Sequence, residues 1–397
     1  MPEFLRSKMM MIIFAAVGVV IVAAAVFFFA TNLGNRDDAS DTFLTYDVIP
    51  LPTEPTPPGE PPPPRRWDDA FLEDNVFILP DSLLTGLPIH EENLNRRPVA
   101  VVINNIHRAL PQSGIASADI IYESLSEGDV TRLIGIFQSA LPEMIGPVRS
   151  ARDYFVDFAF NHDALFVHHG ASPSGYTRIR GQRIDHVDGM TWEGRVFWRD
   201  RTYPYWARNT GTRPVEHSSF TGGERITQHI DEQDIRDVLG ENPAFGFVFG
   251  EVPGDYDGIA DRIEVPFSPN YVRTFVFNPM TGLYYVYNRD GAHVDALNQQ
   301  QVTVTNVLIQ LTTKRVVDAE GRRDVDTIGS GVGYLATSGT YRPVRWEKTS
   351  HADPMRWYFE DGEPLVLPPG RIWVCVFQSN GAVLFEEMDV EEAVTEE

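Results

Sequence analysis

The longest hydrophobic run of the chain covers residues 9–30, which are 22 consecutive uncharged positions. At 1.5 Å per residue, a helix of this length crosses a hydrocarbon core of about 30 Å. Arg6 and Lys8 precede the run, and basic residues stay on the cytoplasmic side of a membrane helix. The run lacks a signal-peptidase pattern at its end, so we expect an uncleaved single-pass anchor and not a cleaved signal peptide. Residues 1–8 would then be cytoplasmic, and the remainder of the chain would be extracytoplasmic at the cell membrane.

Polar and proline-rich sequence follows over residues 31–69, with nine prolines between Pro50 and Pro64. Such a segment cannot bury a core and favours an extended polyproline helix, so it predicts a stiff linker. A polyproline ligand for a recognition domain is the alternative.

Short apolar runs alternate with helical patterns over residues 81–235, which predicts an α/β domain. Ser150 is expected to cap a helix that continues to about Asn161, and Ser172-Pro173 to open another that continues to about Ile179. The strands are expected within residues 98–103, 118–123, 132–137 and 164–168.

Residues 255–385 are rich in β-branched and aromatic runs separated by turn residues, and predict a smaller, mostly β domain. Its strands are expected at 274–277, 283–287, 302–311 and 372–377, before an acidic tail at 386–397. The predicted fold class is therefore α/β, with a layered mixed sheet and helices first and a mostly β domain second.

Charge and cysteine content narrow the function. The net charge of −23 argues against a nucleic-acid partner, which needs a basic footprint. The single cysteine, Cys375, excludes an internal disulfide and lies in an apolar run that predicts a packed thiol. No cofactor motif is present: the glycines of 329–333 precede a strand-like segment and not a helix.

The segment 146–153 places Arg149, Ser150 and Arg152 at a predicted helix start. Free backbone N–H groups and the helix dipole favour anions there, so these residues predict an anion site. The alternative is that Ser150 only caps the helix and that the arginines pair with Asp153 and Asp157.

A second group of candidates follows the strand at 164–168. Ligands of open α/β sheets gather at the carboxyl ends of strands, which favours His168 and His169, with Ser172 and Tyr176 behind them. No metal-ligand spacing is present, so no metal site is expected. Taken singly, each histidine is as well explained by a structural hydrogen bond.

Eight arginines and three tryptophans crowd residues 178–213, including the neighbours Trp198 and Arg199. Guanidinium forks and aromatic faces suit an anionic glycan or a polymer phosphate. A solvated loop that pairs with acidic neighbours is the plainer interpretation.

Several motifs resemble the YerB-like family of bacterial extracytoplasmic proteins, most of which are predicted lipoproteins. The motifs lie at residues 97–105, 111–114, 118–123, 131–132, 146–157, 163–164, 168, 172–173, 331–334, 344–348 and 367–373. The resemblance implies a two-part architecture and a location outside the cytoplasm, but no reaction. This chain lacks the lipid-acceptor cysteine. Its His217 lies in the segment 216–220, where the family would lead us to expect a His-Asn dipeptide.

Two functions remain open. The first is a membrane-anchored envelope protein that binds an anionic envelope component or a protein partner. The alternative is a hydrolase or transferase that acts on envelope glycan, with Asp157, His168 or His169 as acid or base. For the first function, we expect Arg149, Ser150, Arg152 and His168 to line one pocket.

Overall fold

The computed structural model describes residues 80–201, 213–240, 245–252, 256–289 and 291–388. The predicted anchor and linker, and residues 389–397 of the predicted tail, lie outside these ranges. Within them, none of the helices combines the length and the apolar character that crossing a membrane requires.

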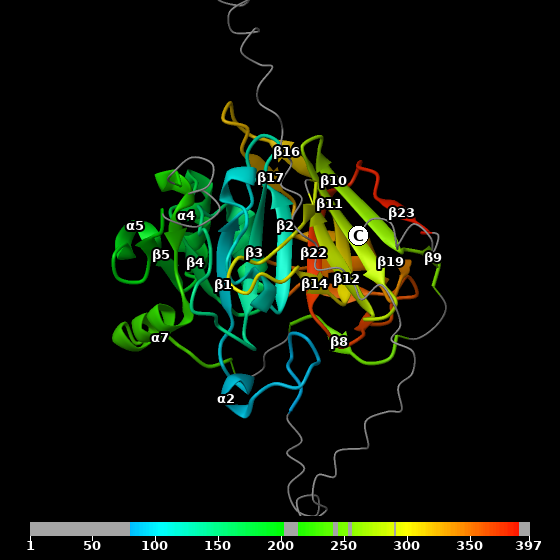
Figure 1. Cartoon of the computed structure of the whole chain (residues 1–397), viewed down its shortest axis with the longest axis horizontal. Helices are drawn as coiled ribbons and strands as arrows, with labels where there is room; N and C mark the ends of the chain where they lie inside the picture. Colours follow the sequence, from blue (N-terminus) through cyan, green and yellow to red (C-terminus); the bar gives the residue numbers. More distant parts are fainter. Residues whose placement is uncertain (1–79, 202–212, 241–244, 253–255, 290, 389–397) are drawn as a thin grey trace, which may run out of the picture. The chain divides into compact units, whose positions relative to one another are not determined.

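The largest element is an 11-stranded sheet, seen across the middle of Figure 1. Its strands follow the order β20-β19-β18-β15-β22-β2-β3-β1-β4-β5, and β9 pairs with β19. In chain order they are β1 (Val99–Asn104), β2 (Ile120–Leu125), β3 (Thr131–Phe137), β4 (Leu165–His168), β5 (His186–Asp188), β9 (Gly258–Ile259), β15 (Asn306–Thr312), β18 (Gly329–Thr337), β19 (Thr340–Lys348), β20 (Arg356–Tyr358) and β22 (Ile372–Gln378).

The sheet is mixed, and the α/β class predicted from the sequence is confirmed. β1, β4 and β5 run parallel, while β3 is antiparallel to both β1 and β2. The three parallel strands end at Asn104, His168 and Asp188, which therefore share one edge of the sheet.

Strand β22 joins the first and last parts of the chain. It lies parallel between β2 and β15, so one sheet continues through both predicted domains. Cys375 is buried in β22, which confirms the packed thiol.

Alternate residues of β1 enter different cores. Val99, Val101 and Ile103 belong to the core on one face of the sheet, and Ala100 and Val102 to the core on the other. Such double burial explains the continuous apolar run, because a strand covered on both faces has no polar side. Each buried valine or isoleucine stabilises the fold by about 1.5–3 kcal/mol.

A second sheet, whose described strand pairs are antiparallel, closes the first core. This sheet follows the order β13-β12-β11-β10-β23, with β14 on β12. The mostly β character of the second half is confirmed. The strands are β10 (Arg262–Ser268), β11 (Tyr271–Asn278), β12 (Leu283–Asn288), β13 (Gly291–Ala292), β14 (Thr303–Val304) and β23 (Leu384–Glu386).

Helices α3 and α4 pack together and contribute to the second core. Ser172 caps α4 (Pro173–Gln182) by accepting the N–H of Gly175 at 3.0 Å, as predicted. The prediction that Ser150 caps α3 is wrong. Helix α3 (Asp153–Phe160) begins after Arg152, whose side chain makes no capping bond, and the Ser150 hydroxyl instead donates to the carbonyl of His169.

Short elements complete the described chain and carry the loops of the candidate site. They are α2 (Glu91–Leu94), η2 (His107–Ala109), η3 (Ile115–Ser117), α5 (Gly189–Trp192), β6 (Trp198–Arg199), η4 (Val215–His217), β7 (Ser219–Phe220), α7 (Gly223–Glu232), β8 (Val248–Phe249), β16 (Lys314–Val316), β17 (Arg323–Val325) and β21 (Val366–Leu367).

Candidate functional site

The ladder of β6 and β7 positions polar side chains at the carboxyl ends of β1 and β4. Arg199 pairs with Ser219 in this ladder, and Trp198 pairs with Phe220. Because successive residues of a strand point to opposite faces, the side chains of Arg199 and Trp198 lie on opposite faces of the ladder. We call the group on the Arg199 side the arginine–histidine cluster: Asn104, Arg149, His169, Arg199, His217 and Ser219.

His169 lies at the centre of the cluster, directly after β4. Its Nδ1 atom is 2.8 Å from the hydroxyl of Ser219, and its Nε2 atom is 3.1 Å from Nη2 of Arg199. Glu193 lies 3.6 Å from the same Nε2 atom. Burial and the charge of Arg199 lower the pKa of His169, against the opposing effect of Glu193.

Arg199 is held by three further bonds. It forms a two-pronged ion pair with Glu193, at 2.5 Å from Nε and 2.8 Å from Nη2. Its Nη1 atom donates to the carbonyl of Val215 at 2.8 Å. Because hydrogen bonds hold each nitrogen of this guanidinium, its position is fixed, which favours selective binding of an anion.

Arg149 approaches the cluster from the segment beside β1. Its amide donates to Val102 and its carbonyl accepts from His169, so both neighbouring strands hold its backbone. Its side chain donates to the carbonyl of Glu216 at 2.8 Å, at an exposed position. Among the described residues, no carboxylate lies within ion-pair distance of Arg149.

His217 closes the cluster from the end of η4. Its Nδ1 atom lies 2.9 Å from the side-chain amide of the buried Asn104, and its Nε2 atom lies 3.9 Å from Glu216. Burial and the charge of Arg149 lower the pKa of His217.

The cluster offers many hydrogen-bond donors, and its two arginines are matched in number by two glutamates. Glu193 pairs with Arg199, whereas the exposed Glu216 acts on Arg149 without a direct ion pair. The lowered pKa values of the two histidines favour their neutral forms. Burial lowers the pKa of Arg149; the charge of Glu216 opposes this effect, and the charge of Arg199 adds to it, so the two arginines disfavour each other's charge. An anion placed between them would relieve this repulsion and accept charge-assisted hydrogen bonds.

The structure separates the other predicted residues from this cluster. Arg152 turns to Glu127 and to the carbonyl of Ala151, while the carbonyl of Ser150 accepts from Arg132. His168 is fully buried and Trp198 points to the opposite face of the ladder. Of the four side chains expected to line one pocket, only Arg149 faces the arginine–histidine cluster.

His168 belongs to a buried network around Asp188. Its Nδ1 atom is 2.8 Å from the carbonyl of Gly170, and its Nε2 atom is 3.1 Å from His186. Tyr176 donates to Asp188 at 2.7 Å. Burial lowers the pKa of His168 to about 4, so this imidazole is neutral at physiological pH.

Asp157 lies elsewhere, on the buried side of α3. Its carboxylate accepts from Arg178 at 2.8 Å and from Thr327 at 2.5 Å, and His351 lies 3.0 Å away. These contacts surround the Asp157 carboxylate, as expected for a structural ion pair and not for a catalytic acid or base. The described residues bring no three metal-ligating side chains together.

Sequence reasoning missed Asn104, Glu193 and Ser219. Asn104 and Ser219 contribute through contacts across long chain separations, 113 residues for Asn104 and His217 and 50 residues for Ser219 and His169. Glu193 is only six residues from its partner Arg199. One local signal was available, since Asn104 ends a buried strand at the edge where ligands of α/β sheets bind.

The fold and the cluster define a mixed α/β protein with a cluster of arginine and histidine donors at the carboxyl ends of its parallel strands. Two family models match the chain, described as the N-terminal and C-terminal domains of a protein of unknown function (DUF3048), at residues 84–236 and 263–374. The chain belongs to this family, and its resemblance to YerB-like proteins is confirmed.

The comparison with known proteins gives YerB from Bacillus subtilis (strain 168), which is named as a candidate lipoprotein. It is 32% identical over 296 residues, covering 73% of this chain and 84% of that protein. The crystal structure of Bacillus subtilis YerB matches with a TM-score of 0.68 and 29% identity, covering 77% of this chain and 99% of that one.

Proposed function

We propose that this protein is anchored to the cell membrane by residues 9–30 and binds an anionic component of the cell envelope at the arginine–histidine cluster. The apolar run and its basic flank support the anchor. The candidate-lipoprotein name of the Bacillus subtilis relative agrees with an extracytoplasmic protein held at a membrane. Here a helix would replace the lipid, because the only cysteine is the buried Cys375.

The observation that carries the binding proposal is the position of Arg149. Its guanidinium lies close enough to Arg199 for the two charges to influence each other, and its side-chain hydrogen bond goes to a backbone carbonyl. A phosphate or carboxylate between Arg149 and Arg199 would accept hydrogen bonds from their remaining donors.

Binding assays on the full-length protein test this proposal. Short-chain polyphosphate serves as a polymer phosphate, and polygalacturonate serves as a carboxylated glycan. We expect at least one of them to bind, and more weakly as the salt concentration rises, because salt screens exposed charges.

The test variant is Arg149→Gln and its matched control is Arg180→Gln, an exposed arginine on α4. Loss of a charge-assisted hydrogen bond should weaken binding by about 1.5–3 kcal/mol in the test variant. The control should bind as the wild type does. Equal binding by both variants, or binding of neither polymer by the wild type, contradicts the proposal.

A further inference from the structure

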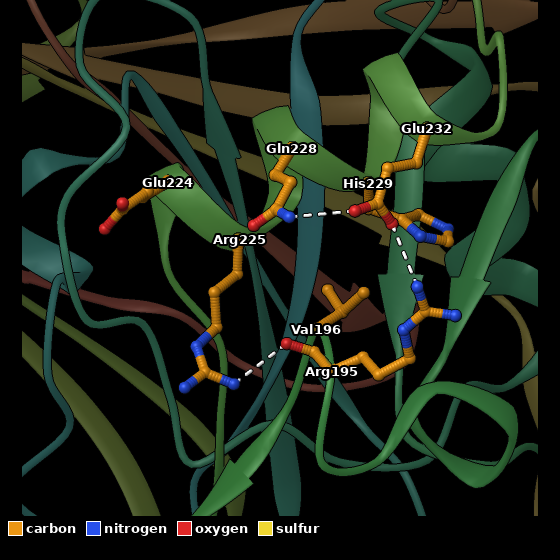
Figure 2. A pocket seen from close by; sticks show the side chains of 7 residues that line it. All are labelled: Arg195, Val196, Glu224, Arg225, Gln228, His229 and Glu232. Carbon is orange, nitrogen blue, oxygen red and sulfur yellow. Dashed lines mark hydrogen bonds and ion pairs between the residues drawn. The ribbon is translucent and has the colours of Figure 1, made fainter.

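A cavity lies on the Trp198 side of the β6–β7 ladder, between α7 and the loop that precedes β6. It encloses about 430 Å³, within the range of about 300–1,000 Å³ that is typical of small-molecule sites. Figure 2 shows the side chains that line it, with Val196 among polar residues. The polar residues that line it are Arg195, Glu224, Arg225, Gln228, His229 and Glu232.

Helix α7 supplies most of this lining because its sequence places polar residues along one stripe. Positions 224, 228 and 232 are four residues apart, and 225 and 229 lie beside them. Gly223 and Ile226 are buried against the protein, and His229 is also buried although it lines the cavity. The helix thus uses one face for packing and offers the other to the cavity.

Aromatic rings fix the two arginines of the cavity. The guanidinium of Arg195 lies 5.5 Å from the ring centre of Trp192, and that of Arg225 lies 4.9 Å from the ring centre of Trp198. Cation–π contacts of this kind stabilise and orient a guanidinium. His229 packs against Trp192 with a centroid distance of 4.4 Å, so the imidazole is held as well.

Hydrogen bonds hold the remaining groups of the wall. Gln228 donates to Glu232 at 2.8 Å, and Arg195 donates to the other oxygen of Glu232 at 3.3 Å. Arg225 donates to the carbonyl of Arg195 at 2.8 Å. These bonds, visible in Figure 2, order the wall before any ligand enters.

The charges of the cavity balance. Arg195 and Arg225 oppose Glu224 and Glu232, and burial lowers the pKa of His229, which favours its neutral form. An anion would meet two carboxylates and a cation would meet two guanidiniums. A neutral ligand is repelled neither by the carboxylates nor by the guanidiniums. Vicinal hydroxyl groups suit such a site, because each hydroxyl both donates and accepts hydrogen bonds.

We infer that the cavity between α7 and residues 192–196 binds a neutral sugar unit of a glycan. This inference rests on the proposed function, because it takes the ligand to be a component of the cell envelope. The guanidiniums and the Gln228 amide would donate to hydroxyl or acetamide oxygens, and the glutamates would accept from hydroxyl groups. The sugar unit and the anionic group would then occupy separate sites. Trp198 contacts Arg225 of the sugar site, and its neighbour Arg199 contacts His169 of the anion site.

The probe is chitotetraose, a neutral oligosaccharide with hydroxyl and acetamide groups, titrated into the full-length protein by calorimetry. Gln228→Leu removes an exposed amide of the cavity wall, and Gln233→Leu makes the same change just beyond α7. Loss of the hydrogen bonds of one amide should weaken chitotetraose binding about fivefold or more in Gln228→Leu, and Gln233→Leu should bind as the wild type does. Arg225→Lys keeps the charge but loses the planar fork, so it should also weaken binding.

Three results would overturn the inference: no chitotetraose binding by the wild type, equal weakening in Gln228→Leu and Gln233→Leu, or displacement of chitotetraose by polyphosphate. Arg149→Gln lies outside the cavity and should bind chitotetraose normally. If the wild type binds chitotetraose but no anionic polymer, the result contradicts the proposed anion site and supports the sugar site. If it binds an anionic polymer but not chitotetraose, the result contradicts the sugar site alone.

Discussion

The Nε2 atom of His169 lies 3.1 Å from the guanidinium of Arg199. A guanidinium can only donate, so Nε2 accepts this bond and the proton of the neutral imidazole is assigned to Nδ1, where it is donated to Ser219. His169 is therefore neutral while no anion is bound. An anion in the cluster would favour the protonated imidazole, so binding and protonation are coupled.

A methyl group at Gly189 should disturb this arrangement. A Cβ atom there would lie 2.2 Å from Nδ1 of His169, so the ring must move and its bond to Ser219 must lengthen. We expect Gly189→Ala to weaken polyphosphate binding by about 1 kcal/mol, the contribution of one hydrogen bond. Gly181→Ala is the control, because a Cβ atom there meets no neighbour within 4 Å. Unchanged binding in Gly189→Ala would show that the position of His169 does not matter.

Buried His168 should make the protein less stable in acid. Its pKa is about 4 in the folded state and about 6.5 when unfolded, so between these values the unfolded chain binds more protons. Its contribution to the free energy of unfolding is complete above pH 6.5 and is lost as the pH falls towards 4, by about 2 kcal/mol between pH 7 and pH 5.

Urea unfolding at pH 7 and pH 5 measures this effect. His168→Gln should lower stability at pH 7 and reduce the difference between the two pH values. His90→Gln, at an exposed position, should leave the difference unchanged. If the free energy of unfolding of His168→Gln differs between pH 7 and pH 5 as much as that of the wild type, groups other than His168 cause the acid sensitivity.

The ion pair between Glu123 and Arg273 should stabilise the contact of the two large sheets. Its atoms are 2.7 Å apart, and each side chain is only 2% exposed. Arg273→Met would leave the Glu123 carboxylate buried without its charged partner, which costs about 3–5 kcal/mol. Thermal unfolding should show a large loss for this variant and a small one for Arg315→Met, which removes an exposed pair with Asp324. Similar losses in the two variants would contradict the importance of burial.

The sequence predicted the local elements better than their arrangement. The expected strands at 98–103 and 372–377 correspond to β1 and β22, and Ser172 caps α4, because apolar runs and caps depend on neighbouring residues. The parallel pairing of β22 with β2 was not predicted. It joins residues about 250 positions apart, such as Ile120 and Ile372, and no local pattern encodes such a partner.

The candidate site was predicted only in part for the same reason. Arg149, His169 and Arg199 were named from the sequence and lie in the arginine–histidine cluster. Arg152 and His168 have equally suitable chemistry, but Arg152 turns to Glu127 and the burial of β4 encloses His168. Composition identifies residues that can bind an anion, whereas side-chain direction decides which of them do so.

Histidine titration by NMR tests the anion site most directly. The pKa values of His169 and His217 are measured on the labelled full-length protein with and without short-chain polyphosphate, and the resonances are assigned with His169→Gln and His217→Gln. An anion between Arg149 and Arg199 stabilises protonated imidazoles nearby, so we expect polyphosphate to raise both pKa values. Identical pKa values for His169 and His217 with and without polyphosphate would contradict anion binding at the arginine–histidine cluster.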